Sequence, residues 1–177
     1  MNSLKAILAV VTFPLMLAAC SQNKVSEHEA NEKTANAVTQ TVTLQNDTTN
    51  QVFSSYNALK DALVASNADE AQKEASELAT ALSKVSGSEN PTKIAHRIAS
   101  SIDLAQQRAD FTNLSDEVIA LMKKAQVSQG TIFIQYCPMA NAGKGGYWMA
   151  ADSEVRNPYY GDEMLNCGEV KEEIKSK

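Results

Sequence analysis

Residues 131–151, "TIFIQYCPMANAGKGGYWMAA", mark the point where the composition of the chain changes. The stretch begins with β-branched and aromatic residues, which favour a strand, and its "GKGG" is a turn signal. After that turn, "YWMAA" can return as a partner strand. We therefore expect a small β-hairpin here.

Before the hairpin, apolar residues recur at helical spacing. The stripes consist of Val52, Tyr56, Leu59 and Leu63, then Ala71, Ala75, Leu78, Leu82 and Val85, then Ile94, Ile98, Ile102, Ala105 and Ala109, and finally Phe111, Leu114, Val118, Leu121 and Ala125. The last two stripes differ in phase, so we expect either one kinked helix or a break near Thr112 and Asn113. The expected fold class is mainly α: an antiparallel three- or four-helix bundle with a small C-terminal β-hairpin subdomain.

After the hairpin, "RNPYYGDEMLNCG" is rich in turn-forming residues. We expect Arg156 to hold a turn there by pairing with Asp162 or Glu163, with contact to a ligand as the alternative. The expected globular domain spans 48–177 and consists of a helical bundle at 48–128, a β-hairpin and turn-rich subdomain at 129–170, and a tail at 171–177.

The N-terminal residues have the features of an export signal. Lys5 is followed by an apolar run that ends in small residues beside Cys20, and this run is too short for a comfortable membrane-spanning helix. We therefore expect residues 1–19 to be a signal peptide. "LAAC", which ends at Cys20, resembles the lipobox of bacterial lipoproteins; the alternative is an ordinary signal peptide with an incidental cysteine.

The lipobox resemblance implies cleavage before Cys20 and attachment of Cys20 to the lipid bilayer. Ser21 at the next position implies the outer membrane, so the expected location is the bacterial cell envelope, lipid-anchored and facing the periplasm. Residues 20–47 are then the lipidated cysteine and a flexible polar tether, in which "VTQTVTL" alternates and can pair as a short strand.

Charge and composition exclude several classes of function. The formal net charge is −5, and it becomes −6 when Lys5 leaves with the signal peptide. An acidic chain without a basic stripe argues against nucleic acid as a partner. With two histidines, no serine elbow motif and no C-x-x-C pair, the chain lacks the usual parts of a hydrolase or thioredoxin-type enzyme. We expect no enzymatic activity, and the sequence leaves the oligomeric state open.

Four sulfur-containing residues form two short pairs. Cys137 and Met139 lie two apart, so they project to one side of an extended chain, while Met164 and Cys167 have the spacing of neighbours on a helical turn. The four donors would converge if the hairpin folds back on the terminal segment. Soft thiolate and thioether ligands select Cu(I), or its mimic Ag(I). We predict a soft-metal site at these four residues.

Three further residues are secondary candidates for metal contact. Met149 is expected mainly to fill a gap in the core, and Trp148 to form an apolar floor whose ring face suits a bound cation. His96 lies among apolar residues and is expected to be a partly buried structural histidine.

The cysteines also allow two other states. In an oxidising compartment Cys137 and Cys167 can form a disulfide, which would close a loop of about 30 residues and stabilise by roughly 3.6 kcal/mol. Alternatively, they stay free or redox-active. A bridge can also form at rest and open when a metal or a reductant arrives.

The motifs from Val52 to Val170 resemble a family. They include "QRADFTNLS", "YCPMA", "GYW" and "RNPYYGDEMLNCG", and they resemble a bacterial periplasmic domain of unknown function. That domain is found on lipoproteins and at the C-terminus of heavy-metal efflux adaptors of the copper and silver type. The chain lacks the long hairpin and lipoyl-like regions of an adaptor, so it is not the adaptor itself.

The resemblance implies a function linked to metal efflux or tolerance. We expect an exported lipoprotein that binds or hands over a soft metal ion such as Cu(I), with a metal efflux complex as its partner. The alternative is a non-catalytic envelope interaction module braced by a Cys137–Cys167 disulfide.

Overall fold

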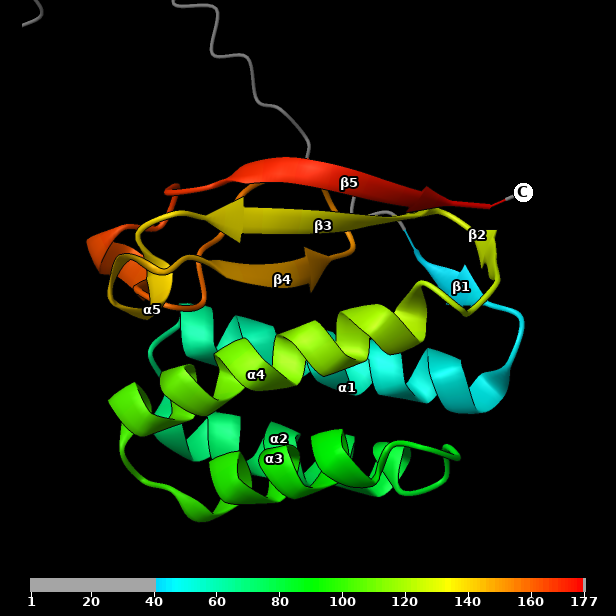
Figure 1. The fold of residues 1–177 in the computed structure, drawn as a ribbon, viewed down its shortest axis with the longest axis horizontal. Coiled ribbons are helices and arrows are strands. Elements are labelled where there is room, and N and C mark those ends of the chain that lie inside the picture. The colour runs from blue at the N-terminus through cyan, green and yellow to red at the C-terminus, as the bar shows by residue number, and fades with distance from the viewer. Residues whose placement is uncertain (1–40, 177) are drawn as a thin grey trace, which may run out of the picture. The chain divides into compact units, whose positions relative to one another are not determined.

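The computed structural model describes residues 41–176, which are about half helical and carry two small antiparallel sheets (Figure 1). The four long helices are α1 (Asp47–Val64), α2 (Ala68–Leu82), α3 (Glu89–Ser100) and α4 (Leu104–Met122). Each packs against the next, and α1 and α4 lie between the larger sheet and the pair α2 and α3. The predicted signal peptide, the lipidated Cys20 and most of the tether lie outside the described residues.

Side chains before the helices fix where they begin. Asn46 accepts hydrogen bonds from the backbone amides of Thr48 and Thr49, at 2.9 and 3.2 Å, and so caps α1. Asn67 caps α2 in the same way, and Asp103 caps α4. These bonds satisfy amide groups that have no partner inside the helix.

The break between the last two helices lies earlier than expected. The chain leaves α3 at Ser101, and α4 runs without interruption through Thr112 and Asn113. Asp103 supplies the cap that starts α4, while the Thr112 hydroxyl bonds to the carbonyl of Arg108 within the helix. Both expected forms, one kinked helix and a break near Thr112 and Asn113, were therefore wrong.

The apolar stripe that suggested that break is exposed at its C-terminal end. Ile102 is 80% exposed, and Ala105 and Ala109 also face outward. The buried face of α4 instead contains Gln107, Asp110, Phe111, Thr112, Leu114, Ser115, Val118, Ile119 and Met122. Small or isolated apolar residues do not by themselves define a buried face.

The larger sheet has the order β4-β3-β5. It consists of β3 (Thr131–Cys137), β4 (Gly146–Ala150) and β5 (Glu169–Lys175), with β3 antiparallel to both neighbours. The smaller sheet pairs β1 (Thr43–Leu44) with β2 (Val127–Gln129), so a strand does form at the end of "VTQTVTL". Two short helical turns, α5 (Ala140–Gly143) and η1 (Gly161–Glu163), lie in the connections.

Residues 171–175 were expected to belong to a tail, but they form most of β5. Ile174 packs against the core, and the charged residues on either side of it are exposed. This strand lies at the edge of the sheet, where charged side chains are common. The high charge of "EVKEEIK" hid the strand pattern.

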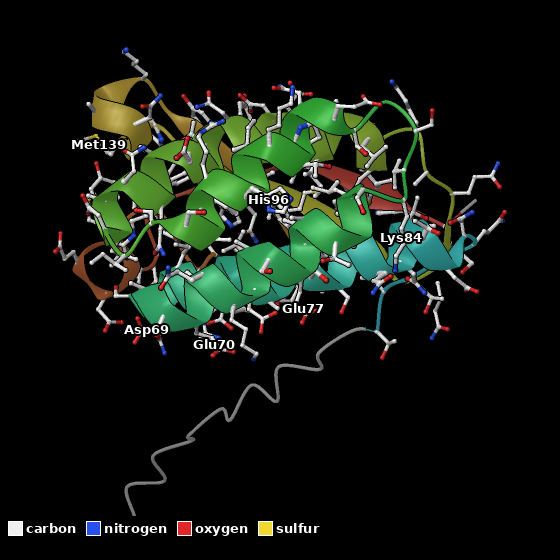
Figure 2. All side chains as sticks on the ribbon, turned by 90° about the horizontal axis from the view of Figure 1, so that it is seen from below. Asp69, Glu70, Glu77, Lys84, His96 and Met139 are labelled. Carbon is white, nitrogen blue, oxygen red and sulfur yellow. The ribbon has the colours of Figure 1, made fainter. Side chains whose placement is uncertain are left out.

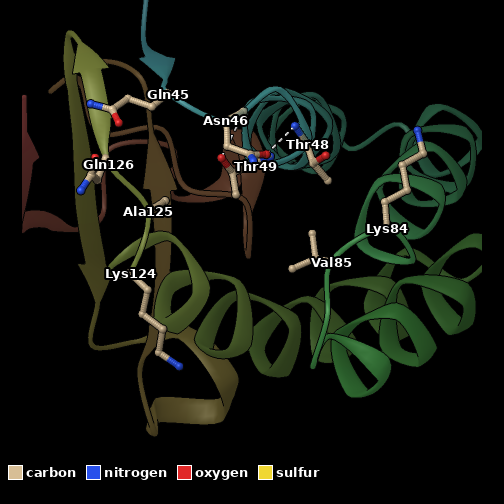
Figure 3. A pocket seen from close by; sticks show the side chains of 9 residues that line it. All are labelled: Gln45, Asn46, Thr48, Thr49, Lys84, Val85, Lys124, Ala125 and Gln126. Carbon is tan, nitrogen blue, oxygen red and sulfur yellow. Dashed lines mark hydrogen bonds between the residues drawn. The ribbon is translucent and has the colours of Figure 1, made fainter.

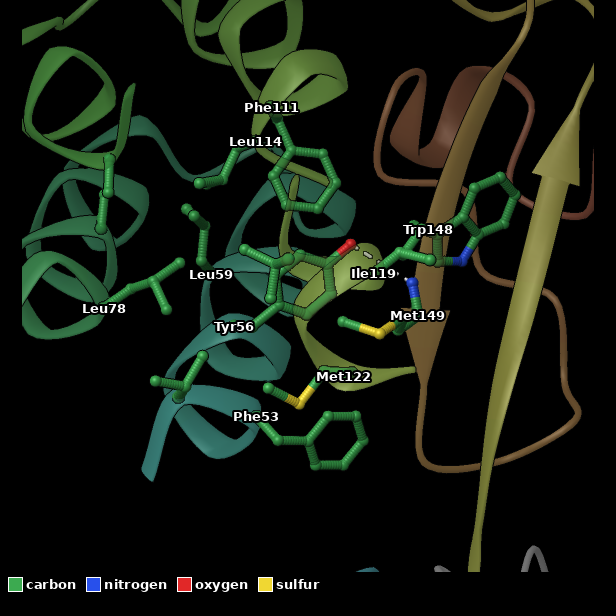
Figure 4. Packing of buried hydrophobic residues seen from close by; sticks show 14 of the residues in the cluster. Phe53, Tyr56, Leu59, Leu78, Phe111, Leu114, Ile119, Met122, Trp148 and Met149 are labelled. Carbon is green, nitrogen blue, oxygen red and sulfur yellow. Dashed lines mark hydrogen bonds between the residues drawn. The ribbon is translucent and has the colours of Figure 1, made fainter. Parts of the chain in front are cut away.

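A series of aromatic rings joins the helices to the sheet, and Figure 4 shows Tyr56, Phe111 and Trp148 among them. Tyr56 stacks on Phe111 with centroids 5.4 Å apart, Phe111 lies 5.9 Å from Tyr159, and Tyr159 meets Trp148 edge-on at 5.9 Å. Tyr56 and Trp148 are fully buried. The hairpin and the helices therefore share one core.

The Tyr56 hydroxyl adds polar contacts inside this core. Its oxygen lies 2.7 Å from Ser115 Oγ and accepts a hydrogen bond from the backbone amide of Met149 at 3.2 Å. Burial raises the pKa of Tyr56 well above its ordinary value, so the hydroxyl stays neutral.

Among residues 41–176, no helix has the length and apolar character needed to cross a bilayer.

Candidate functional site

The sulfur atoms of Cys137 and Cys167 lie 2.8 Å apart, although the two residues are thirty positions apart in the chain. Both cysteines are free thiols in this structure. Cys137 is fully buried, whereas Cys167 is partly exposed to solvent. The pair thus has an inner and an outer thiol.

Strand pairing places the inner thiol. Cys137 is the last residue of β3 and lies opposite Gly146 of β4. By strand alternation it projects to the same face as Gln135, which lies opposite Trp148. Cys137 and the indole of Trp148 are therefore neighbours on one face of the sheet.

A tight turn places the outer thiol. The Cys167 amide donates to the carbonyl of Met164 at 3.0 Å, and Gly168 follows with φ +146° before β5 begins. A Cβ at Gly168 would lie 2.8 Å from Cη2 of Trp148 and 2.9 Å from the carbonyl oxygen of Tyr136. Glycine at this position lets the chain pass close to the tryptophan.

Asn157 holds the turn from within and was not identified from the sequence. It is fully buried, and its side chain donates to the carbonyl of Cys167 at 3.0 Å and accepts from the amide of Tyr159 at 2.8 Å. Its backbone amide donates to the carbonyl of Leu165. The Asn-Pro dipeptide was the available signal, because asparagine often bonds to the backbone two residues on.

Contact with the inner thiol changes the acidity of the outer one. The hydrogen bond with Cys137 raises the pKa of Cys167, and burial and charge repulsion by Cys137 act in the same direction. A backbone hydrogen bond from Met139 opposes the shift. Reduced Cys167 is therefore less often a thiolate at a given pH than an isolated cysteine.

Alkylation of reduced Cys167 should show this shift. With iodoacetamide under anaerobic conditions, we expect the pH midpoint of the reaction to move down in a Cys137→Ala variant, because both the hydrogen bond and the charge repulsion are removed. The rate would be followed by mass spectrometry on the peptide that carries Cys167. Identical pH profiles in the two proteins would contradict the assigned cause.

The two methionines flank the pair without completing it. Met139 is 51% exposed, and its carbonyl accepts a hydrogen bond from the Tyr160 hydroxyl at 2.7 Å. Met164 is partly buried and follows η1 rather than lying on a regular helix. Within residues 41–176 neither thioether makes a hydrogen bond to a cysteine. Met139 thus lies in the turn that follows Cys137, and Met164 lies in the turn that contains Cys167.

The secondary candidates lie in other surroundings. His96 is exposed on α3, so the expectation of a partly buried histidine was wrong. It also lies apart from Met139 in Figure 2. Met149 is fully buried and points toward the helices (Figure 4). Trp148 is fully buried, and no hydrogen-bond partner for its indole nitrogen is found among the described residues.

The atoms that Cys137 and Cys167 could offer to a metal ion are both sulfurs. In the described part of the chain, no three His, Cys, Asp or Glu side chains cluster so that they could hold a metal ion. A metal bound by Cys137 and Cys167 would draw on two thiols and on the thioethers beside them. Such donors suit a soft monovalent ion better than zinc, which takes four N, O or thiolate ligands.

Figure 3 shows a separate hollow of about 480 Å³ at the start of α1. Lys84 and Lys124 are among the residues that line it, but the backbone amides of Thr48 and Thr49 already bond to Asn46. The hollow therefore offers no free cluster of amides to a ligand.

Comparison with known proteins gives one match. Residues 52–130 match the model of a family described as a protein of unknown function (DUF3347). The match supports the part of the resemblance that concerns a domain of unknown function. It covers the four long helices except the start of α1 and ends before β3, so the cysteine pair lies outside it. No curated protein and no solved structure matches the chain.

Proposed function

We propose that this protein binds a soft monovalent metal ion, Cu(I) or Ag(I), between Cys137 and Cys167. The observation that carries the proposal is that the two sulfurs meet in one place, with a methionine in each adjoining turn. Their separation of 2.8 Å would have to widen for an ion to lie between them. Cu(I) prefers soft donors, and two thiolates also neutralise its charge. Binding would release the thiol protons, since only the thiolate is a ligand.

Exposure gives each donor a role in this proposal. Cys137 is fully buried and is the anchoring ligand, whereas Cys167 is partly exposed. Met139 is half exposed and provides a thioether through which an ion can enter or leave. Met164 is the fourth candidate donor. A gradient from an exposed to a buried sulfur suits a protein that accepts an ion and hands it over.

The cellular part of the proposal comes from the sequence. A lipid anchor at Cys20 and a polar tether would hold the domain at the outer membrane, facing the periplasm. The motif resemblance supports a link to metal efflux or tolerance and an efflux complex as partner. In this role the chain is a metal-binding lipoprotein without enzymatic activity.

The second candidate is a non-catalytic envelope interaction module braced by a Cys137–Cys167 disulfide. The burial of Cys137 and the short sulfur separation favour it, because a bridge here needs little movement of the backbone. Intact mass before and after alkylation of protein taken directly from the periplasm tests this candidate. Full alkylation of both cysteines without a reductant would exclude it.

Anaerobic competition for Cu(I) against a chromogenic chelator tests the metal proposal. In a Cys20→Ser background, we expect the double substitution Cys137→Ser and Cys167→Ser to weaken Cu(I) binding by at least about a hundredfold. Loss of a residue that only supports a metal ligand already costs up to about a hundredfold in affinity, and here both thiolate ligands are lost. Met139→Leu should weaken it less. Fluorescence of Trp148, the chain's single tryptophan, should change on binding.

Met149→Leu is the matched control, because this methionine is buried toward the helices, whereas strand alternation puts Cys137 on the other face of the sheet. Leucine also has a similar volume. We expect its affinity for Cu(I) to equal that of the parent protein. Parent protein that competes no better than the double serine variant would overturn the proposal.

A further inference from the structure

A cavity of about 540 Å³ lies between the C-terminal half of α1 and the segment that joins β4 to β5. Its walls carry five charged side chains: Lys60, Asp61, Asp152, Arg156 and Asp162. Val64 and Leu165 add apolar surface. The cavity therefore presents both signs of charge around an apolar patch.

One pair of these charges is already neutralised. The side chain of Lys60 is only 6% exposed, and its Nζ lies 2.8 Å from Oδ1 of Asp61. A buried ammonium group needs such a partner. The remaining charges of the cavity are Arg156, Asp152 and Asp162.

Arg156 differs from the other two arginines of the chain. Arg97 pairs with Asp110 at 2.8 Å, and Arg108 donates to the carbonyls of Leu63 and Pro158. Among residues 41–176 no ion pair or hydrogen bond of the Arg156 side chain is found. The expected pairing of Arg156 with Asp162 or Glu163 is therefore absent, although Arg156 and Asp162 line the same cavity.

The two carboxylates are also largely available. Asp152 accepts one hydrogen bond, from the amide of Glu154 at 3.1 Å, which fixes its orientation. Asp162 has no side-chain partner in the described residues. Opposite charges that share a cavity without pairing suit a ligand that carries both charges, since each end then meets its complement.

We propose that this cavity binds a small zwitterion of the α-amino carboxylate type. Arg156 receives the carboxylate of the ligand, Asp152 and Asp162 receive its ammonium group, and Val64 and Leu165 contact its side chain. This site is independent of the proposed metal function, which uses none of these residues.

Titration calorimetry with L-leucine and two matched analogues tests the charge requirement. 4-Methylpentanoate lacks the ammonium group of leucine, and 3-methylbutylamine lacks its carboxylate. We expect leucine to bind about tenfold more tightly than either analogue, because each charged end forms charge-assisted hydrogen bonds. Absence of leucine binding at millimolar concentration, or equal binding of all three compounds, would overturn the proposal.

Two substitutions of exposed residues locate the site. Arg156→Gln should weaken leucine binding about tenfold and leave 3-methylbutylamine unchanged, whereas Asp162→Asn should weaken leucine similarly and leave 4-methylpentanoate unchanged. Unaltered leucine affinity in both variants would place any binding elsewhere and reject this cavity. The double serine variant at Cys137 and Cys167 should bind leucine like the parent, so the result does not depend on the metal site.

Discussion

Replacement of Trp148 by alanine is expected to lower the free energy of unfolding by about 3–5 kcal/mol, the usual cost of removing a large buried aromatic ring. The ring is fully buried, meets Tyr159 edge-on and lies against Gly168. Glycine offers no side chain that could fill the space left behind. Urea unfolding followed by circular dichroism measures the loss, since the variant has no tryptophan to report it.

Tyr147→Ala provides the control from the neighbouring position of β4. Tyr147 is 41% exposed, and its main ring contact is with Tyr136 at 4.5 Å. We expect a loss of no more than about 1.5 kcal/mol, the upper value for one aromatic pair. Equal losses at Trp148 and Tyr147 would contradict the view that the indole is the centre of this part of the core.

Asn157→Ala is expected to destabilise the protein by about 3 kcal/mol, because it leaves two groups without partners at a cost of roughly 1–3 kcal/mol each. The groups are the amide of Tyr159 and the carbonyl of Cys167. The turn that carries the outer thiol would then lose its internal support. Chemical unfolding gives the stability change, and the Cu(I) competition assay gives any accompanying change in affinity.

Asn157→Asp adds a pH-dependent test of the same position. An ionised aspartate can accept from the amide of Tyr159 but cannot donate to the carbonyl of Cys167, and its charge would be buried without a partner. A neutral carboxyl group can donate to that carbonyl, so we expect the stability of this variant relative to the parent to increase as the pH is lowered. A stability difference that does not change with pH would contradict this prediction.

The elements with strong local patterns were the most predictable. Val52, Tyr56, Leu59 and Leu63 are all buried on α1, as their helical spacing indicates. The stripe through Ile102 and Ala105 was misleading, because its spacing crosses the break between α3 and α4. Strand β5 was missed, since the exposed positions of an edge strand can be charged and the pattern then resembles a polar tail.

The candidate site depends on contacts between distant parts of the chain, and these were harder to predict. The expectation that Cys137 and Cys167 approach each other required the chain to fold back, and β5 supplies the return strand. The supporting role of Asn157 depends on where the Cys167 turn lies, which no local pattern gives. The pairing proposed for Arg156 failed because short separation in the sequence does not fix the direction of a side chain.

The packed aromatic rings that join the helices to the sheet also bear on whether the protein can be cut into separately folding fragments. The matched family segment ends at residue 130, yet Trp148 and Tyr159, which complete the chain of rings that starts at Tyr56 and Phe111, come later. A fragment that stopped at the family boundary would leave the Phe111 ring open to water and the Tyr56 hydroxyl without the amide of Met149. The segment matched by the family model and the segment that carries the cysteines therefore share one core, and we expect neither to fold on its own.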